Sequence, residues 1–499
     1  MRNSRIPESN GSDPKPLLAS RVLRGVVWST AEQIGGRAVS FVVLAVLARL
    51  LVPEDFGLLA LAMVVISFGE RLAEQGLSEM IIREPELKPG FLESAFLVNL
   101  LGSGLLAGIT IGASWSLARL LKDPAVQPLL ITLSLTFLFI GGSAVPMALL
   151  QRRMQFRSLA RCSLTGSVLG GVTGVVLAAS GAGVWSLVFL QLVASGTSAL
   201  LYWRAAAWMP ATWPGTRFFK SQLRFGASIL GIRTGNFLNR RSDDLFIGVF
   251  LGTVALGYYA IAYKVYWTLS LFVLGSLKRV AFPAFSKIIA SREELGDRYR
   301  QAVTMTVLAA FPAFAGIALT ADTVIPLLFG TGWGPSARVL MVVAPVGLLH
   351  AVVYYVDPIL VALGRVRLLL RLEIASGILN AAAFAAAAQV NLMAVAWAFA
   401  AVNTLLFPVR IEILRRVTGI GPRVYAGPVF RALGMTLFMG AGVLGTSALL
   451  RGSVALPVLL LAEVAAGALL YGGGWTVLAT LLPAWRHDLE PLRTAIRVS

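Results

Sequence analysis

The sequence predicts an all-α polytopic membrane protein, and three observations support that prediction. Of the 499 residues, 57% are hydrophobic and only 13% are charged, and the mean hydropathy is +0.78. Average soluble domains carry about 25% charged residues. Apolar stretches of about 20 residues, the length of a membrane-spanning helix, recur along most of the chain. The basic residues gather on one predicted side of the membrane, as they do in membrane proteins.

The chain begins with a polar, proline-containing segment, residues 1–21, that predicts a disordered tail. A signal peptide would place a short apolar core and a small-residue cleavage site here, and neither is present. We therefore expect the N-terminus to lie in the cytoplasm.

Hydropathy predicts fourteen spans in the following residues, with proline, glycine and charge clusters marking their ends. Their ranges are 26–49, 57–80, 93–118, 126–150, 160–180, 184–203, 222–249, 254–277, 302–328, 336–362, 370–389, 392–414, 430–450 and 454–482. Residues 483–499 form a second predicted cytoplasmic tail.

Lysine and arginine orient these spans. With the N-terminus inside, 32 of the 43 basic residues fall on or next to the cytoplasmic connections. Five fall on the opposite side: Arg49, Arg119, Lys122, Arg338 and Arg451. This asymmetry predicts that both termini are cytoplasmic. It also accounts for the net charge of +19 through orientation and contact with anionic headgroups, so we expect membrane lipids and no nucleic acid as partners.

An internal repeat is visible at an offset of 200 residues. The stretch 51–65 (LVPEDFGLLALAMVV) matches 251–265 (LGTVALGYYAIAYKV) at five positions, including Gly57 with Gly257. Six spans separate the two copies, so the copies have the same orientation. We therefore predict two six-helix lobes, 22–208 and 217–416, related by a pseudo-two-fold axis along the membrane normal. Residues 430–482 add spans 13 and 14.

The seventh predicted span carries polar residues that an apolar helix would exclude. They are Arg233, Asn236, Arg240, Asp243 and Asp244. At 100° per residue these positions fall within about 100° of one helical face. One charge at the centre of the bilayer costs roughly 2.5–3.5 kcal/mol, so the stripe is expected to line a wet cavity between the lobes. Asp243 is also placed to pair with Arg240 along the helix. Ion pairing between packed helices is the structural alternative.

Other spans carry isolated polar groups. Arg37 and Glu32 lie in span 1, Glu70 in span 2, Lys264 in span 8 and Asp357 in span 10. Three aromatic residues flank Lys264, and the simplest interpretation of them is packing or an interfacial belt. They are Tyr259, Tyr263 and Trp267.

Two segments, 48–83 and 239–265, resemble the polysaccharide-export (Wzx-like) flippases of the multidrug/oligosaccharidyl-lipid/polysaccharide exporter superfamily. The second segment shows that family's pattern of an Asn or Arg, an Asp, an L-x-I-G run and L-G-x-Y-x-x-A. The matching residues are Arg240, Asp243, Gly248, Gly257 and Tyr259, whereas Asp244 departs from the pattern. The resemblance is greatest to the exopolysaccharide branch, of the colanic acid and succinoglycan type.

This resemblance implies transport across the bacterial inner membrane. The expected substrate is a polyprenyl-pyrophosphate-linked oligosaccharide repeat unit. It would pass from the cytoplasmic to the periplasmic leaflet by alternating access, for exopolysaccharide or lipopolysaccharide biosynthesis. A polymerase and glycosyltransferases of the same pathway are expected partners.

Roles for the polar residues follow from that expectation. Arginine forks suit phosphate oxygens, so the predicted substrate-binding residues are Arg37, Arg233, Asn236, Arg240 and Lys264. The ion-pair or coupling candidates are Glu32, Glu70, Asp243, Asp244 and Asp357. The sugar-stacking candidates are Tyr259, Tyr263 and Trp267.

Two other functions compete with this interpretation. A multidrug/ion antiporter of the same superfamily would favour acidic cavity residues, whereas the stripe here is led by arginine. A membrane-embedded polymerase or ligase needs a sizeable extracytoplasmic loop, and the predicted outer connections are short. We expect no enzymatic activity and no cofactor. One cysteine, Cys162, and two histidines, His350 and His487, argue against a metal site.

Overall fold

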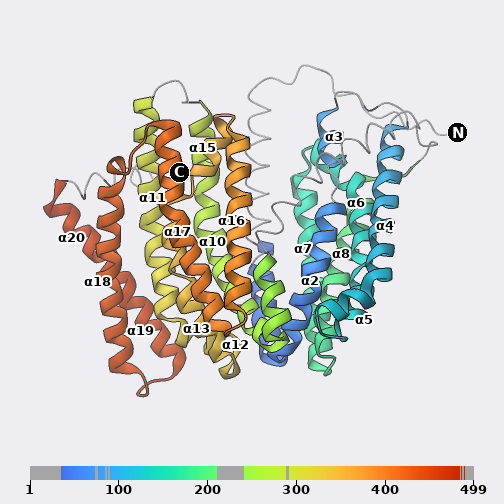
Figure 1. The fold of residues 1–499 in the computed structure, drawn as a ribbon, viewed down its shortest axis with the longest axis horizontal. Helices are drawn as coiled ribbons and strands as arrows, with labels where there is room; N and C mark the ends of the chain where they lie inside the picture. The colour runs from blue at the N-terminus through green and yellow to red at the C-terminus, as the bar shows by residue number, and fades with distance from the viewer. Residues whose placement is uncertain are drawn as a thin grey trace. The chain divides into compact units, whose positions relative to one another are not determined.

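The computed structural model describes residues 35–36, 38–73, 77–84, 87, 90–210, 241–287, 292–483, 485 and 488, and within these ranges the regular elements are helices (Figure 1). In chain order the first are α2 (Pro53–Ala73), α3 (Leu77–Arg83), α4 (Phe91–Leu120), α5 (Val126–Leu133), α6 (Leu135–Arg152), α7 (Phe156–Ala179) and α8 (Val184–Ala206). Then come α10 (Thr253–Lys287), α11 (Arg292–Leu319), α12 (Ala321–Phe329), α13 (Gly334–Val343), α14 (Val346–Val353) and α15 (Val356–Ala362). The last are α16 (Val366–Ala387), α17 (Leu392–Thr418), α18 (Ala426–Leu450), α19 (Leu456–Ala468) and α20 (Gly474–Leu481).

Eleven segments of the described residues are long and apolar enough to cross a membrane, and each coincides with a predicted span. This confirms the prediction of an all-α polytopic membrane protein. Of the other three predicted spans, the first is described as the shorter apolar helix Ala38–Leu50 and the eighth as α10. The seventh is described only from residue 241, where the helical segment 241–251 begins. The number fourteen stays a prediction.

Two spans differ in detail from the sequence-based ranges. The span predicted at 302–328 is the helix α11, which starts earlier and ends at Leu319 before the separate helix α12. The span predicted at 336–362 consists of three short helices, α13, α14 and α15. The chain turns at Tyr354–Tyr355, just before Pro358. Proline has no N–H to donate to the carbonyl of residue 354 and its ring crowds that carbonyl, so the helix is interrupted there.

The chain divides into two compact units. One comprises Met1–Leu44, Ile66–Ser114 and Pro128–Ile232, and the other comprises Ala45–Val65, Trp115–Gln127 and Arg233–Ser499. These boundaries cut through α2 and α4 and are not those of the predicted lobes. The lobe boundaries at 208 and 217, and the pseudo-two-fold axis along the membrane normal, stay predictions.

In the first unit, α7 packs along α8 at close range. Gly166 and Gly170 lie one turn apart on α7, and a Cβ atom at either position would lie 2.6 Å and 2.5 Å from carbonyl oxygens of α8. Small residues at such spacing let two membrane helices approach closely, which increases their van der Waals contact. Trp203 of α8 also donates a 2.9 Å hydrogen bond to the carbonyl of Gly142 on α6.

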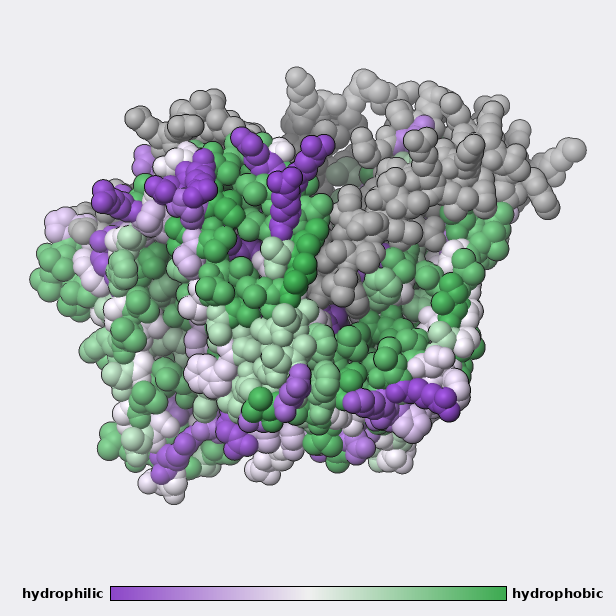
Figure 2. All heavy atoms as spheres, in the orientation of Figure 1, coloured by the Kyte–Doolittle hydropathy of each residue, from purple (hydrophilic) through white to green (hydrophobic). Residues whose placement is uncertain are grey.

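In the second unit, α10 packs against α11 and α13, and α17 packs against α13, α14 and α16. Over α16, α17 and α18 the visible surface is hydrophobic between hydrophilic residues at its upper and lower edges (Figure 2). Trp397, Leu405 and Phe438 are among the large apolar side chains exposed on α17 and α18. An exposed apolar band with polar edges is what a helix bundle presents to lipid.

The two glycines that the repeat placed in register contact each other's helices within the second unit. A Cβ atom on Gly57 would lie 1.7 Å from the carbonyl oxygen of Thr253, and one on Gly257 would lie 1.8 Å from that of Pro53. Pro53 and Thr253 are themselves 200 residues apart. The contact is therefore reciprocal: the first turn of α2 and the first turn of α10 use equivalent positions. We call these four residues the glycine contact.

Trp333 packs beside the glycine contact. Its indole N–H donates a 2.8 Å hydrogen bond to the carbonyl of Ala48, and its ring meets Phe56 and Tyr258 edge-on at 5.4 and 5.9 Å. Arg49 donates hydrogen bonds to the carbonyls of the last turn of α12. These residues lie at the predicted outer ends of their spans.

Candidate functional site

Helix α10 has one exposed and one buried face. Lys264 and Trp267, three residues apart, are exposed, and 38% of the surface of Trp267 is accessible. Tyr259, Ala262 and Tyr266 are buried. An ammonium group facing hydrocarbon is costly at membrane depth. The exposed face of α10 is therefore better suited to an aqueous cavity than to lipid.

A buried pair of carboxylates lies behind this face, at the start of the helical segment 241–251. Asp243 is 4% exposed and accepts a 2.9 Å hydrogen bond from the hydroxyl of Tyr259. Its other oxygen accepts a 3.0 Å bond from the backbone N–H of Asp244. A buried carboxylate needs such donors, because an unpaired one costs several kcal/mol. The aromatic ring of Tyr259 stacks on that of Tyr263 at 5.6 Å.

Arg241 forms an ion pair with the second carboxylate. Its guanidinium lies 2.6 Å from Asp244, which is 6% exposed, while the Arg241 side chain is 37% exposed. The arginine thus covers the buried acid and presents its outer edge to solvent. Lys264 is near enough for its charge to interact with that of Arg241. Two cations therefore lie on the accessible side and the two acids lie beneath them.

A separate ionic cluster joins three later helices. Arg410 of α17 lies 2.7 Å from Asp357 of α15 and 2.9 Å from Glu373 of α16. Only 20% of the Arg410 side chain is accessible. One arginine bridging two carboxylates holds the three helices in register.

The predicted site residues have different outcomes. Asp243, Asp244, Tyr259, Tyr263 and Lys264 come together at the junction of segment 241–251 with α10. Five others, Glu32, Arg37, Arg233, Asn236 and Arg240, lie outside the described residues. The predicted pairing of Asp243 with Arg240 therefore stays a prediction.

The structure also describes the other predicted carboxylates and the three aromatic candidates. Glu70 is half-buried on α2, and Asp357 belongs to the Arg410 cluster. Tyr259, a sugar-stacking candidate, is fully buried and presents no ring face in this conformation. Tyr263 and Trp267 keep accessible surface. The assigned roles of all these residues stay predictions.

Sequence reasoning did not select four residues that the structure places in polar networks: Arg241, His350, Glu373 and Arg410. Arg241 lies beside the recognised stripe, and its pairing with Asp244 was detectable as an i, i+3 spacing. Arg410 was counted only as a cytoplasmic charge. His350 is a histidine within a predicted span, which is itself a signal that was available.

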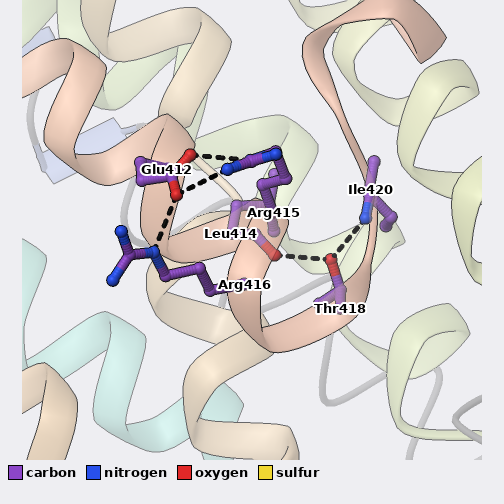
Figure 3. Close-up of polar contacts among 6 residues, drawn as sticks. All are labelled: Glu412, Leu414, Arg415, Arg416, Thr418 and Ile420. Carbon is purple, nitrogen blue, oxygen red and sulfur yellow. Dashed lines mark hydrogen bonds and ion pairs between the residues drawn. The ribbon is translucent and has the colours of Figure 1, made fainter.

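The end of α17 shows how ordinary surface charges are arranged in this protein. Glu412 accepts hydrogen bonds from Arg415 and Arg416 at 2.7–2.8 Å, and the Thr418 hydroxyl donates to the carbonyl of Leu414 and accepts from the N–H of Ile420 (Figure 3). Basic residues near a helix C-terminus complement its dipole. More than half of each arginine side chain is accessible, so this cluster suits lipid headgroups or water.

Within the described residues, no group of three or more histidine, cysteine, aspartate or glutamate side chains is arranged to hold a metal ion.

Comparison with known proteins places the chain among carbohydrate-polymer biosynthesis proteins. A family model described as polysaccharide biosynthesis protein matches residues 46–338. The lipopolysaccharide biosynthesis protein WzxC of Escherichia coli (strain K12) is 28% identical over 356 residues, which cover 70% of this chain and 71% of WzxC. The succinoglycan biosynthesis transport protein ExoT of Rhizobium meliloti (strain 1021) is 29% identical over 327 residues, or 65% of this chain and 66% of ExoT.

Among solved structures, the fold matches that of the lipid II flippase MurJ in its inward closed conformation. The TM-score is 0.74, and the match covers 91% of this chain and 99% of MurJ. Sequence identity is 12%, so this likeness concerns the fold alone.

Proposed function

The chain belongs to the polysaccharide biosynthesis protein family, and we propose that it carries a polyprenyl-pyrophosphate-linked oligosaccharide across the bacterial inner membrane. The relative ExoT is described as a transport protein, and the structural neighbour MurJ as a flippase. The step moves a headgroup from the cytoplasmic to the periplasmic leaflet and changes no covalent bond. A chain of many apolar helices with an accessible cationic helix face supports it.

The observation that carries this proposal is the exposed lysine on α10. A lipid pyrophosphate brings about two negative charges, and a cationic surface lowers the cost of holding that headgroup away from water. Lys264 and Arg241 supply two positive charges there, and the acids that would repel a phosphate are occupied by Arg241 and Tyr259. Substrate-binding roles for Arg37, Arg233, Arg240 and Asn236, which lie outside the described residues, belong to the same proposal.

Aromatic rings beside the cations are proposed to hold the sugars. Trp267 is exposed one turn from Lys264, and a ring face can stack on the apolar face of a pyranose. Tyr263 lies between Trp267 and the buried Tyr259 and is partly accessible. In this conformation Trp267 is therefore the strongest stacking candidate.

The remaining assignments belong to the same proposal. Both termini lie in the cytoplasm, and 22–208 and 217–416 act as the two lobes of an alternating-access transporter. Glu32, Glu70, Asp243, Asp244 and Asp357 are ion-pair or coupling residues. A polymerase of the same pathway receives the translocated repeat unit. A multidrug antiporter would instead bind organic cations, which the pairing of Asp243 and Asp244 with donors disfavours.

The test is complementation of a flippase-deficient bacterium at matched membrane levels of each variant. Lys264→Gln should abolish most polysaccharide export, and Lys264→Arg should retain it in part because the charge is kept. Lys122→Gln is the matched control, since Lys122 is exposed on the connection between α4 and α5. Wild-type export by the Lys264→Gln variant would remove Lys264 from the site.

A further inference from the structure

A histidine lies inside the helix bundle of the second unit. His350 is on α14, the middle helix of the interrupted span. Its Nδ1 lies 2.7 Å from the hydroxyl of Tyr266 on α10, and its Nε2 lies 2.9 Å from Oδ1 of Asn403 on α17. We call these three residues the histidine network. It joins α10, whose other face carries Lys264, to two helices on its buried side.

The hydrogen bonds decide which ring nitrogen carries the proton when the imidazole is neutral. The Asn403 amide donates a 2.8 Å bond from Nδ2 to the carbonyl of Phe399, so its Oδ1 faces the histidine and can only accept. Nε2 therefore carries the ring proton. In the neutral ring, Nδ1 has a free lone pair and accepts from the hydroxyl of Tyr266. The neutral imidazole thus has both nitrogens satisfied in this conformation.

Among the described residues, the titratable and charged groups around the ring include side chains of three helices. From α10 they are Tyr266 and, beside it, Tyr263, and from α11 Tyr299 donates to the carbonyl of Val352. From α17 Arg410 acts on the ring electrostatically. Arg410 in turn forms ion pairs with Asp357 and Glu373. Lys264 is two residues from Tyr266.

Protonation of His350 would change this network. With a proton on Nδ1, the ring nitrogen becomes a donor. The Tyr266 hydroxyl oxygen then accepts this hydrogen bond, and the O–H of Tyr266 needs another acceptor. Tyr266 is enclosed by the rings of Phe314 and Phe399. An unsatisfied buried donor costs about 1–3 kcal/mol. Protonation therefore favours a shift of α10 relative to α14. The same helix carries Lys264 and Trp267.

We infer that His350 is a proton-binding site whose proton is taken up together with the pyrophosphate headgroup. This inference rests on the proposed function. The protonated ring adds a positive charge next to Arg410, and its partner Tyr266 lies two residues from Lys264, where substrate anions offset that charge. By linkage, a proton that strengthens anion binding is itself bound more tightly when the anion is present.

Isothermal titration calorimetry of the full-length protein in nanodiscs tests the inference. The probe is a short-chain polyprenyl diphosphate, titrated in pairs of buffers with different ionisation enthalpies between about pH 5.5 and 8. The wild type should bind the probe and take up as much as about one proton per ligand within that range. His350→Gln should still bind but lose the uptake. His487→Gln, which changes the other histidine, should keep it.

A second variant keeps the inference testable if His350→Gln does not fold. Asn403→Asp places a carboxylate against Nε2 and favours the protonated ring before ligand arrives. Uptake on binding should therefore move to higher pH, with thermal unfolding checked in parallel. Absence of probe binding by the wild type would contradict the proposed function. Binding without proton uptake, or uptake retained by His350→Gln, would overturn the inference while leaving the proposed function standing.

Discussion

The glycine contact and the histidine network lie on the same helix and are built differently. The glycine contact joins the first turns of α2 and α10 through backbone, with no room for a single methyl group at Gly57 or Gly257. The histidine network lies about two turns further along α10 and joins helices through side-chain hydrogen bonds at 2.7 and 2.9 Å. One contact cannot change without separating the helices, whereas the other can rearrange when a single proton moves. A transporter needs both kinds of contact.

The largest expected effect is at the glycine contact. Gly257→Ala places a Cβ atom 1.8 Å from the carbonyl oxygen of Pro53, so the two helices have to separate. We expect a loss of at least about 3 kcal/mol of stability, or failure to recover folded protein. Thermal unfolding of the detergent-purified protein measures this.

The matched control lies on the same helix. A Cβ atom added to Gly275 would meet no atom within 4 Å beyond its chain neighbours and the backbone of its own helix. Gly275→Ala should therefore be neutral or slightly stabilising, because alanine is the better helix former. If Gly257→Ala and Gly275→Ala unfold at the same temperature, the close approach of α2 and α10 is not a determinant of stability.

An intermediate effect is expected at the Arg410 cluster, which belongs to the same polar interior as the histidine network. Arg410→Gln leaves Asp357 and Glu373 without their shared cation. We expect a loss of about 1–3 kcal/mol, because the Asp357 side chain is 44% accessible and partly screened by solvent. Arg416→Gln on the same helix should not change the unfolding temperature measurably, since Arg416 is 75% exposed. Equal effects of the two variants would mean that the interior cluster behaves as a surface one.

The smallest effects on stability come from a pair of substitutions to phenylalanine, one beside the glycine contact and one in the histidine network. Trp333→Phe removes the donor to the Ala48 carbonyl, and Tyr266→Phe removes the donor to His350. Each should cost about 1–2 kcal/mol of stability. Proton uptake on ligand binding should separate them: Trp333→Phe should match the wild type, and Tyr266→Phe should alter the pH at which uptake occurs. The comparison between the two regions fails if both variants alter uptake equally.

The helical spans were readable from the sequence because hydropathy adds up along the chain. Eleven of the predicted spans coincide with apolar helical segments long enough to cross a membrane. The match of Gly57 with Gly257 also had a physical meaning, since equivalent positions contact each other's helices. The interruption after Val353 was harder to predict, although Pro358 was visible, because proline often only kinks a membrane helix.

The hydrogen-bond partners of the polar side chains could not be predicted from the sequence in the same way. The pairing of Asp243 with Arg240, expected from helical spacing, stays a prediction, and among the described residues Asp243 accepts a hydrogen bond from Tyr259 on the next helix. Tyr259 itself looked like a ligand-facing aromatic residue and is buried. Hydropathy does not report which way a tyrosine on a half-exposed helix points.

The sequence by itself determined that this is a multi-spanning membrane protein with an internal repeat, because length, apolar composition and residue identity at a fixed offset are properties of the chain alone. Only the tertiary structure decided that His350 meets Asn403, 53 residues away, and that Arg410 bridges Asp357 and Glu373. Such pairings depend on how each helix is rotated about its axis and on its height relative to its neighbours. Those two quantities are set by packing among all the helices, and no local pattern of residues contains them.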